Sequence, residues 1–438
     1  MIINIPEHIE KILNRYHQNG YEAFCVGGSI RDGIMGKVPY DWDIATSCFP
    51  EKTKELFPDY KIVDTGIRHG TVSLIVDKKC IEVTVFRTDG EYSDNRHPET
   101  VEFKNNIEDD LSRRDFTVNA IAYNNEKGFV DPFCGKADIK NKIIRTVGEP
   151  DKRFKEDGLR LMRALRFSSV LGFCIEENTK KSIHKNKELL NNISKERINA
   201  ELTKLLMGEN VFSVLMEYSD VFSVIIPEIA PAVGFKQYGE KHAYDVWEHI
   251  CHTVATVPAD RILRLTMLLH DLGKVPTHKL NEKGESTFKN HALVGGETAK
   301  KILTDLKFDK KTVNRVSFLI SHHDFEPPET KTALKMQLKA LTPEDVRTLL
   351  IIKKSDRGAL SEPYRDISEK SERVLNWLTE TEENNECTRV SQLNISGADL
   401  IKNGFSGKNV GEALERLLDA VISGEISNTK NELLTYIL

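Results

Sequence analysis

The hydrophobic pattern of the chain changes character near residue 150. Before that point, short apolar runs rich in β-forming residues recur at 22–27, 60–64, 71–76 and 81–87. Few residues separate the last two runs, which predicts neighbouring antiparallel strands. From about Phe154 onward, the apolar residues follow helical spacing to the end of the chain. The pattern therefore predicts an α+β head with a small mixed β-sheet, followed by an all-α remainder.

The length of 438 residues exceeds what a single core usually holds, so two to four domains are expected. Boundaries are predicted near residue 150, in the Pro- and Gly-containing stretch 227–240, and in the polar stretch 379–392. The expected segments are a head over 1–150, a helical neck and body over 151–240, a helical domain over 241–378 and a helical tail over 390–438.

The composition favours a soluble globular protein, with 39% hydrophobic and 29% charged residues. No apolar run approaches the length of a membrane span, and the N-terminus lacks the features of a secretory signal. The seven cysteines form no C-x-x-C pair, so they are expected to be reduced thiols in a cytoplasmic protein. The net charge of −5 does not by itself indicate nucleic-acid binding. The stretch 140–166 is nevertheless rich in Lys and Arg, and a local basic patch can bind a polyanion.

The first strand of the head ends in Gly27-Gly28, where a helix is predicted to start. Glycines at such a point let the backbone approach phosphate oxygens, and the helix N–H groups can then bind them. Arg31 lies one turn further on and can add a charged contact. Taken alone, the segment is an ordinary tight turn.

Two aspartates, Asp41 and Asp43, flank Trp42. On a strand, residues i and i+2 point to the same side, and two carboxylates on one face repel each other unless a cation lies between them. Such a pair suits Mg²⁺, which binds carboxylate and phosphate oxygens together. Glu82, inside an apolar strand, is a candidate third carboxylate. The alternatives are solvent-facing aspartates at a turn and, for Glu82, exposure on an edge strand.

The segment 108–123 places Arg114, Asp115 and Asn119 ahead of an apolar stretch. Arg114 and Asp115 are candidates for binding a triphosphate and a ribose. A capped, salt-bridged helix start would have the same residues.

The segment 156–167 is predicted to be helical, with Asp157, Arg160 and Arg163 on neighbouring parts of one face. Cytosine and adenine both present an amino donor beside a ring-nitrogen acceptor, whereas guanine and uracil present a carbonyl beside a ring N–H. A carboxylate and a guanidinium can therefore accept C and A and reject G and U. An amphipathic helix with an ordinary i,i+3 ion pair is the alternative. Gly158 would then lie inside the helix, at a propensity cost of about 1 kcal/mol.

Histidines and aspartates also recur through the helical segment 242–356. Neutral imidazoles with carboxylates suit Mn²⁺, Fe²⁺, Ni²⁺ or Zn²⁺ and tolerate Mg²⁺. A buried structural cluster is the alternative. The candidates are His249, His270, Asp271, His291, His322, His323, Asp324 and Asp356.

The motifs GGSIRD, DWD, RRDFTVNA and VDPFCGKADI with IIRTVG resemble those of the class II tRNA nucleotidyltransferases, which include the CCA-adding enzymes and bacterial poly(A) polymerases. The resemblance runs to about residue 206. It implies a nucleotidyltransferase fold for the head, Mg²⁺ as cofactor, and tRNA, CTP and ATP as partners, with no membrane. It also implies that Asp157 and Arg160 read the base while Arg163 and Arg166 bind the nucleotide. The polar segment 88–103 matches a loop of relatives that add the terminal A, in CCA-adding and A-only enzymes alike.

The order of the later histidines and aspartates resembles the HD phosphohydrolase superfamily. That resemblance implies a metal site of His249, His270, Asp271 and Asp356, with His291 and His322 as candidates for a second metal. Residues 396–424 resemble the helical tail with which the nucleotidyltransferases grip tRNA, around a turn from Gly404 to Gly411.

The favoured function is addition of C, C and A to the 3′ end of tRNA. The alternatives are a poly(A) polymerase, a CC-only or A-only relative, an enzyme whose main activity is HD-type hydrolysis of a phosphoester, and a non-catalytic RNA-binding protein.

Overall fold

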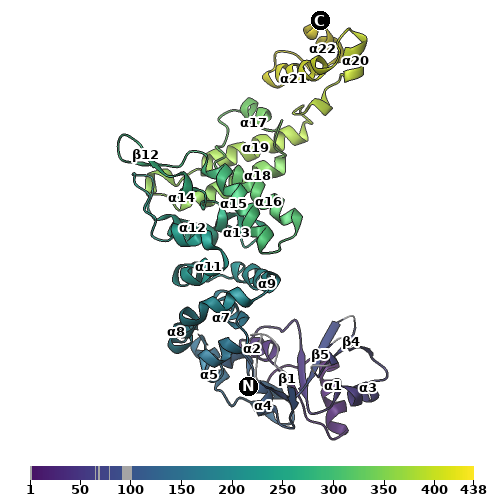
Figure 1. Cartoon of the computed structure of the whole chain (residues 1–438). Helices are drawn as coiled ribbons and strands as arrows, with labels where there is room; N and C mark the ends of the chain where they lie inside the picture. The colour runs from purple at the N-terminus through teal and green to yellow at the C-terminus, as the bar shows by residue number, and fades with distance from the viewer. Residues whose placement is uncertain (1, 65, 68–69, 78, 91–100) are drawn as a thin grey trace. The chain divides into compact units, whose positions relative to one another are not determined.

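The chain forms two compact units in a computed structural model that describes residues 2–64, 66–67, 70–77, 79–90 and 101–438 (Figure 1). The first unit comprises Met1–Ala230 with Asp305–Phe308, and the second comprises Pro231–Thr304 with Asp309–Leu438. The division into four segments by sequence remains a prediction.

A seven-stranded sheet forms the centre of the head, in the order β3-β4-β5-β2-β1-β8-β9. Its strands are β1 (Ala23–Val26), β2 (Asp43–Thr46), β3 (Lys61–Val63), β4 (Thr71–Val76), β5 (Lys79–Val85), β8 (Ala122–Asn124) and β9 (Gly128–Val130). β2 and β5 are parallel, and every other neighbouring pair is antiparallel, so the sheet is mixed as predicted. The predicted antiparallel pairing of 71–76 with 81–87 is confirmed by β4 and β5.

Helices around the sheet complete the head. They are α1 (Glu7–Gln18), α2 (Gly28–Ile34), α3 (Pro50–Leu56), α4 (Ile107–Ser112) and α5 (Gly135–Asn141). Phe24 and Ala45 from the sheet and Leu111 from α4 belong to one buried cluster. Asp43, two residues before Ala45 on β2, lies on the same face of the sheet and lines a cavity.

The polar segment 88–103 was predicted to be a loop. Its two ends instead pair as short antiparallel strands, β6 (Arg87–Asp89) and β7 (Val101–Phe103). The intervening residues 91–100, on which the prediction of a loop rests, lie outside the described residues.

Helices also follow the head within the first unit: α6 (Pro150–Glu156), α7 (Leu159–Leu171), α8 (Glu177–Asn186), α9 (Lys195–Leu206), α10 (Val211–Glu217) and α11 (Ser219–Ile225). α7 packs along α9. The single helix predicted over 156–167 is wrong, because the chain breaks at Asp157, whose φ of −144° and ψ of 105° are extended. Gly158 is the N-cap of α7, so the propensity cost expected for an interior glycine does not arise.

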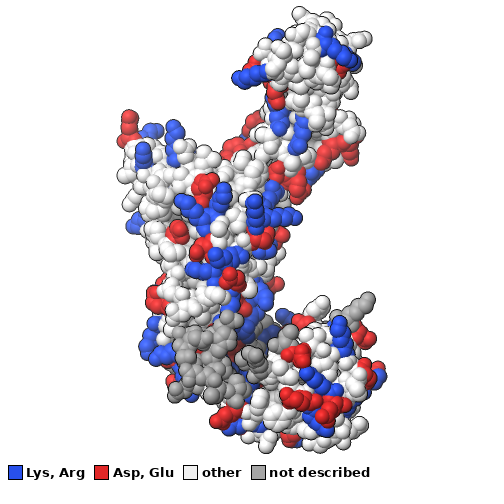
Figure 2. Space-filling model, turned by 45° about the vertical axis from the view of Figure 1, so that its right-hand side comes forward, with Lys and Arg blue, Asp and Glu red and all other residues white. Residues whose placement is uncertain are grey.

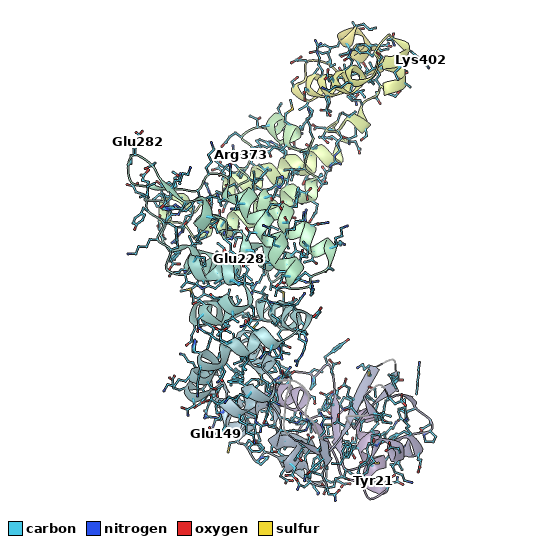
Figure 3. All side chains as sticks on the ribbon, viewed as in Figure 1. Tyr21, Glu149, Glu228, Glu282, Arg373 and Lys402 are labelled. Atoms are coloured by element: carbon cyan, nitrogen blue, oxygen red, sulfur yellow. The ribbon has the colours of Figure 1, made fainter. Side chains whose placement is uncertain are left out.

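The second unit is helical apart from a small hairpin of β12 (Lys279–Leu280) and β13 (Ser286–Thr287), with Glu282 in its turn (Figure 3). Its helices are α12 (Val246–Thr256), α13 (Arg261–Leu269), α14 (Lys274–Thr277), α15 (His291–Asp305), α16 (Lys310–Ser321), α17 (Lys331–Gln337), α18 (Pro343–Gly358) and α19 (Ser368–Glu383), followed by α20 (Gly397–Lys402), α21 (Lys408–Ser423) and α22 (Lys430–Ile437). α13 packs against α12, α16 and α18 at the centre of this unit.

Acidic and basic side chains are interspersed over the displayed surface of both units (Figure 2). Within the described part of the chain, no helix combines the length and the apolar character needed to cross a membrane.

Candidate active site

Two carboxylates lie side by side on the open face of the sheet. Asp43 on β2 and Glu82 on β5 are Cα partners in the parallel ladder, so their side chains share a face. β5 lies between β4 and β2, which excludes the alternative that Glu82 occupies an edge strand. Asp41 precedes β2, so the argument from strand alternation does not apply to it. Trp42, buried between the two aspartates, anchors this approach to the strand.

The pKa of Asp43 reflects its crowded surroundings. Its side chain has accessible surface, but the walls of a cavity exclude much of the bulk water around it. This desolvation, together with the nearby charges of Glu82 and Asp41, raises the pKa of Asp43 to about 6, although Arg114 acts in the opposite direction. A divalent cation would relieve this repulsion, so the carboxylates fit such an ion.

Arg114 is held at the edge of the carboxylate pair. Its guanidinium donates to the buried carboxylate of Asp110, 3.2 Å away, and to the carbonyl of Asn119. Gly27 has a φ of +75°, and a Cβ built there would lie 3.1 Å from the guanidinium of Arg114. The glycine therefore allows both the turn after β1 and the close approach of Arg114.

Arg31 connects α2 to the RRD segment. Its Nη1 donates to Asn119 Oδ1 at 2.7 Å, and Asn119 Nδ2 donates to Asp115 Oδ1 at 3.2 Å. Asp115 also accepts from Arg163 Nε at 2.8 Å. Burial alone would raise the pKa of Asp115, but Arg163 and Arg160 outweigh it and lower the pKa to about 2. The chain Arg31–Asn119–Asp115–Arg163 therefore joins the head to α7.

The side chains of Asp157 and Arg160 have different partners, although the backbone N–H of Arg160 donates to the carbonyl of Asp157 at 2.9 Å. The carboxylate of Asp157 accepts from Arg197 Nη2 at 2.8 Å and Nη1 at 3.2 Å, and from the backbone N–H of Leu159 at 3.0 Å. Arg160 Nη1 donates to Glu156 Oε2 at 2.6 Å. Arg160 also donates to the carbonyls of Arg153 and Arg113, at 3.1 Å each. Each of the two base-reading candidates is thus fixed by a different neighbour.

α9 supplies two of these supporting residues, which sequence reasoning did not identify. Arg197 binds Asp157, and Glu201, one turn later, accepts from Arg166 Nε at 2.5 Å and lies 3.9 Å from Arg163 Nη1. The available signal was the i,i+4 spacing of Arg197 and Glu201 in the predicted helix, although spacing does not reveal a contact partner.

A cavity of about 400 Å³ joins these groups. One wall contains Asp157, at the break before α7, with Arg160 and Arg163 of α7, and the sheet wall contains Asp43 and Glu82. Arg113, Arg114 and Asp115 also line it, as do three residues that sequence reasoning missed: Thr71, Thr84 and Arg87. Gly27, Gly28, Arg31, Asp41, Asn119 and Arg166 do not line it, but Arg31, Asn119 and Arg166 contact residues around it.

The second unit contains a buried cluster of histidines and aspartates. His249 Nε2 lies 3.0 Å from Asp356 Oδ1 and 3.4 Å from Asp271 Oδ2, and His270 Nε2 lies 3.3 Å from Asp271 Oδ2. These four residues can present ligand atoms within 4.8 Å of one another. The predicted set His249, His270, Asp271 and Asp356 is therefore brought together.

A second group shares Asp271 but differs from the prediction. Asp271, His291 and His323 form it, with His291 Nε2 3.1 Å from His323 Nε2. The choice of His322 was wrong: His322 is exposed and its Nδ1 lies 2.8 Å from the carbonyl of Phe318. α16 ends at Ser321, and the turn that follows directs His323 inward instead.

Backbone carbonyls fix the imidazoles of the cluster. The Nδ1 atoms of His270, His291 and His323 lie 2.7–2.8 Å from the carbonyls of Met267, Phe288 and Ile320. This arrangement directs each Nε2 toward Asp271, as in metal-binding histidines generally. Burial would lower the pKa of His270, but Asp271 and Asp356 raise it to about 10. The cluster therefore attracts positive charge, and a divalent cation fits its donors.

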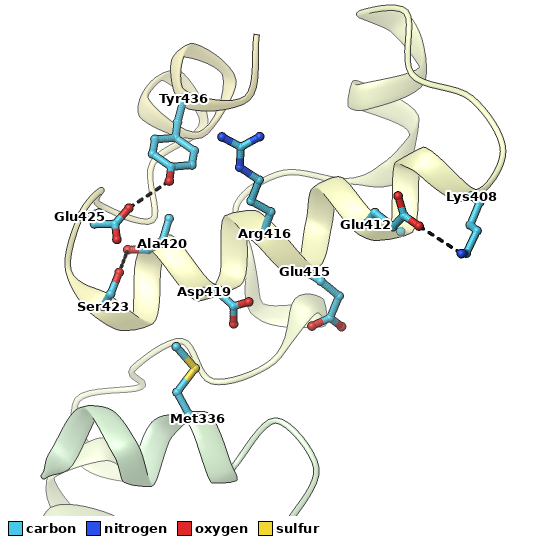
Figure 4. A pocket seen from close by; sticks show the side chains of 11 residues that line it. Met336, Lys408, Glu412, Glu415, Arg416, Asp419, Ala420, Ser423, Glu425 and Tyr436 are labelled. Carbon is cyan, nitrogen blue, oxygen red and sulfur yellow. Dashed lines mark hydrogen bonds and ion pairs between the residues drawn. The ribbon is translucent and has the colours of Figure 1, made fainter.

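A cavity of about 720 Å³ lies at the tail (Figure 4). α21 forms most of it, with Tyr436 of α22 and Met336 of α17. Its four acidic residues, Glu412, Glu415, Asp419 and Glu425, outnumber its basic residues, Lys408 and Arg416, so its charge does not favour a phosphate. The predicted turn over Gly404–Gly411 is shorter than expected, because α21 already begins at Lys408.

Comparison with protein families matches three parts of the chain. The poly A polymerase head domain matches residues 23–145, and the probable RNA and SrmB-binding site of polymerase A matches residues 172–233. The putative domain 2 of tRNA nucleotidyltransferase matches residues 290–437.

Similar proteins extend the match to nearly the whole chain. The CCA-adding enzyme of Geobacillus kaustophilus (strain HTA426) is 33% identical over 439 residues, which is 98% of this chain and 95% of the relative. That of Geobacillus stearothermophilus is 34% identical over 441 residues, with the same two coverages.

Solved structures agree with this match. The crystal structure of the Bacillus stearothermophilus CCA-adding enzyme in complex with CTP has a TM-score of 0.71 and 29% identity, covering 98% of this chain and 95% of that one. The Thermotoga maritima CCA-adding enzyme complexed with tRNA shares the fold, with a TM-score of 0.61 and 20% identity over 99% and 95% of the chains. With one-third identity along almost the full length of both chains, this protein belongs to the CCA-adding enzymes, within the class II tRNA nucleotidyltransferases.

Proposed function

We propose that this protein adds C, C and A to the 3′ end of tRNA from CTP and ATP, without a nucleic-acid template, and releases pyrophosphate. The observation that carries the proposal is the single cavity in which the carboxylates Asp43 and Glu82 face the base-reading candidates Asp157 and Arg160. Relatives named CCA-adding enzymes, with solved complexes of CTP, ATP and tRNA among them, support the choice of substrates.

Asp41 and Asp43 are the residues that would hold Mg²⁺, with Glu82 as the third carboxylate beside them. When bound there, Mg²⁺ ions supply Lewis-acid activation of the attacking 3′-hydroxyl and neutralise charge on the leaving pyrophosphate. The raised pKa of Asp43 supports this assignment, because crowded carboxylates favour an added positive charge.

Two arginines, Arg31 and Arg114, position the incoming nucleotide. Arg31 and Arg114 bind the phosphates and ribose of the incoming nucleotide, with the turn at Gly27 and Gly28 beside them. Asn119 and Asp115 hold Arg31 and Arg163 in place through hydrogen bonds of 2.7 and 2.8 Å. The α-phosphate is thereby presented for in-line attack, and catalysis consists mainly of orientation and charge neutralisation.

The base is selected by Asp157 and Arg160. Asp157 accepts from the exocyclic amino group of C or A, and Arg160 donates to the adjacent ring nitrogen. Uracil and guanine would place a carbonyl against the carboxylate and an N–H against the guanidinium, leaving buried polar groups unpaired at about 1–3 kcal/mol each.

Incubation of the purified protein with Mg²⁺ and a tRNA transcript lacking CCA tests the proposal, with CTP and ATP supplied singly and together. We expect two residues to be added with CTP alone and three with both. Extension by ATP alone on a generic RNA would indicate a poly(A) polymerase, and addition of only C or only A would indicate a partial enzyme. No lengthening with all four nucleoside triphosphates would refute the proposal.

Since the free cysteines form no disulfide, we place the enzyme in the cytoplasm.

A second activity, metal-dependent hydrolysis of a phosphoester, is favoured by the buried cluster in the second unit. His249, His270, Asp271 and Asp356 would hold a divalent ion such as Mn²⁺, Ni²⁺, Fe²⁺ or Mg²⁺. Asp271→Ala should abolish phosphodiesterase release and leave CCA addition intact. Equal phosphodiesterase activity in the variant and the parent would remove the cluster from consideration as a hydrolytic site.

A further inference from the structure

Part of the lining of this cavity lies outside the residues assigned above to nucleotide binding. Thr71, Thr84 and Arg87 line the same 400 Å³ space as Asp43 and Glu82, but they come from β4, β5 and the start of β6. None of them belongs to the motifs by which the head and α7 bind a nucleoside triphosphate.

Strand register places the two threonines on the catalytic face. Thr84 follows Glu82 by two residues on β5, so both side chains point to one side of the sheet. Thr71 is the antiparallel Cα partner of Thr84, and their Oγ1 atoms are 3.0 Å apart. Val72, Val83 and Val85 alternate with them and are buried on the opposite face. The face therefore continues from the carboxylates to a pair of hydroxyl groups.

The geometry of the transfer determines which substrate lies on this wall. The incoming nucleotide occupies the side of Asp157 and Arg160, and the attacking 3′-hydroxyl must approach the carboxylates from another direction. We propose that Thr71, Thr84 and Arg87 bind the 3′-terminal nucleotide of the RNA being extended. Thr71 and Thr84 contact the ribose 2′-hydroxyl, and Arg87 contacts the phosphodiester. This inference rests on the proposed nucleotidyltransferase function.

The chemistry of the three side chains matches such a nucleotide. One hydroxyl hydrogen is shared between the two threonines, which leaves one O–H donor and free lone pairs for a ligand. A ribose 2′-hydroxyl both donates and accepts, and it is the group that distinguishes RNA from DNA. Arg87 offers a planar set of N–H groups suited to phosphate oxygens.

The contribution of Arg87 can be measured with a tRNA transcript that ends in CC and takes up one A. Arg87→Ala should weaken binding of this RNA roughly 10- to 100-fold and leave the Kd for ATP unchanged. The slope of log Kd for RNA against log salt concentration should also fall by about 0.7, because one phosphate contact is lost. Lys79→Ala, on the exposed start of β5 and outside the cavity, is the matched control.

The hydroxyl pair can be tested with the same transcript carrying a terminal 2′-deoxycytidine. The parent enzyme should prefer the ribose primer, and the double substitution Thr71→Val with Thr84→Val should reduce that preference toward one. Thr84→Ser, which keeps a hydroxyl, should retain it. Thermal unfolding checks that each variant is folded.

The results of these experiments distinguish a failure of the proposed RNA-binding wall from a failure of the proposed nucleotidyltransferase function. If the parent enzyme fails to add A, the proposed function is wrong. If the parent extends the RNA but Arg87→Ala leaves both RNA affinity and the salt slope unchanged, this inference alone is wrong. It is equally overturned if Arg87→Ala raises the Kd for ATP instead, or if the valine pair keeps the full ribose preference.

Discussion

Arg197 should control base selectivity without touching the base. Its two charge-assisted hydrogen bonds, at 2.8 and 3.2 Å, fix the orientation of Asp157, and the side chains are only 25% and 18% exposed. Arg197→Met removes both bonds but keeps an unbranched stem of similar length. The loss of one partly buried charge-assisted contact costs about 1.5–3 kcal/mol. If most of this free energy is lost from the transition state for adding C, discrimination between C and U should drop by about 10- to 150-fold.

The measurement is the ratio of kcat/KM for CTP to that for UTP, with a tRNA transcript lacking CCA. Arg197→Lys should give an intermediate ratio, because lysine keeps the charge but not the planar fork. Lys204→Ala, at an exposed position of the same helix, is the control. A folded Arg197→Met enzyme with the parental ratio would contradict the idea that α9 orients the base-reading carboxylate.

Three further predictions concern the metal sites and the packing of α7. Protonation of Asp43, whose pKa is about 6, competes with cation binding. The affinity for divalent metal should therefore fall as the pH drops below 6, by up to about tenfold per pH unit. Metal titrations between pH 5 and 7.5 measure this affinity, and a flat profile would contradict the prediction. Glu201→Gln should lower the free energy of unfolding by about 2 kcal/mol, since the buried carboxylate compensates two arginines, and a urea midpoint equal to that of the parent would argue otherwise. Gly273→Ala should cost about 3 kcal/mol or more and weaken metal binding in the second unit, because a Cβ there would lie 2.2 Å from the carbonyl of His291; calorimetry and Mn²⁺ titration would show whether the packing tolerates it.

Local patterns in the sequence were sufficient to predict much of the head. The antiparallel pair β4 and β5 followed from two closely spaced β-rich runs. A charge inside an apolar run singled out Glu82, and the structure places it next to Asp43. Both inferences depend on strand periodicity, which short stretches of sequence encode directly.

Contacts between distant segments were not predictable in this way. Asp157 and Arg197 are 40 residues apart, and only the packing of α7 on α9 brings them together. The helix break at Asp157 was also missed, because the charged residues around it keep an i,i+3 spacing that is typical of a continuous helix. The choice of His322 came from the resemblance to the HD phosphohydrolases, which does not show which of two adjacent histidines points inward after α16 ends at Ser321.

The hydrogen bonds that hold Asp157 and Arg160 also define what they have left to offer a base. Arg160 has five N–H groups, and three of them donate to Glu156 and two backbone carbonyls. Among the residues that the structure describes, this leaves Nε–H and one Nη2–H to donate to a base. Asp157 uses three of its roughly four acceptor positions on Arg197 and Leu159, so one remains. Two donors beside one acceptor match cytosine, with its ring nitrogen, its carbonyl and its amino group. Adenine has only the amino group and one ring nitrogen on that edge. It therefore pairs with two of these three groups, the acceptor position of Asp157 and one N–H donor of Arg160. Under the proposed function, the same fixed pair would accept both bases but would satisfy its own hydrogen bonds fully only with cytosine.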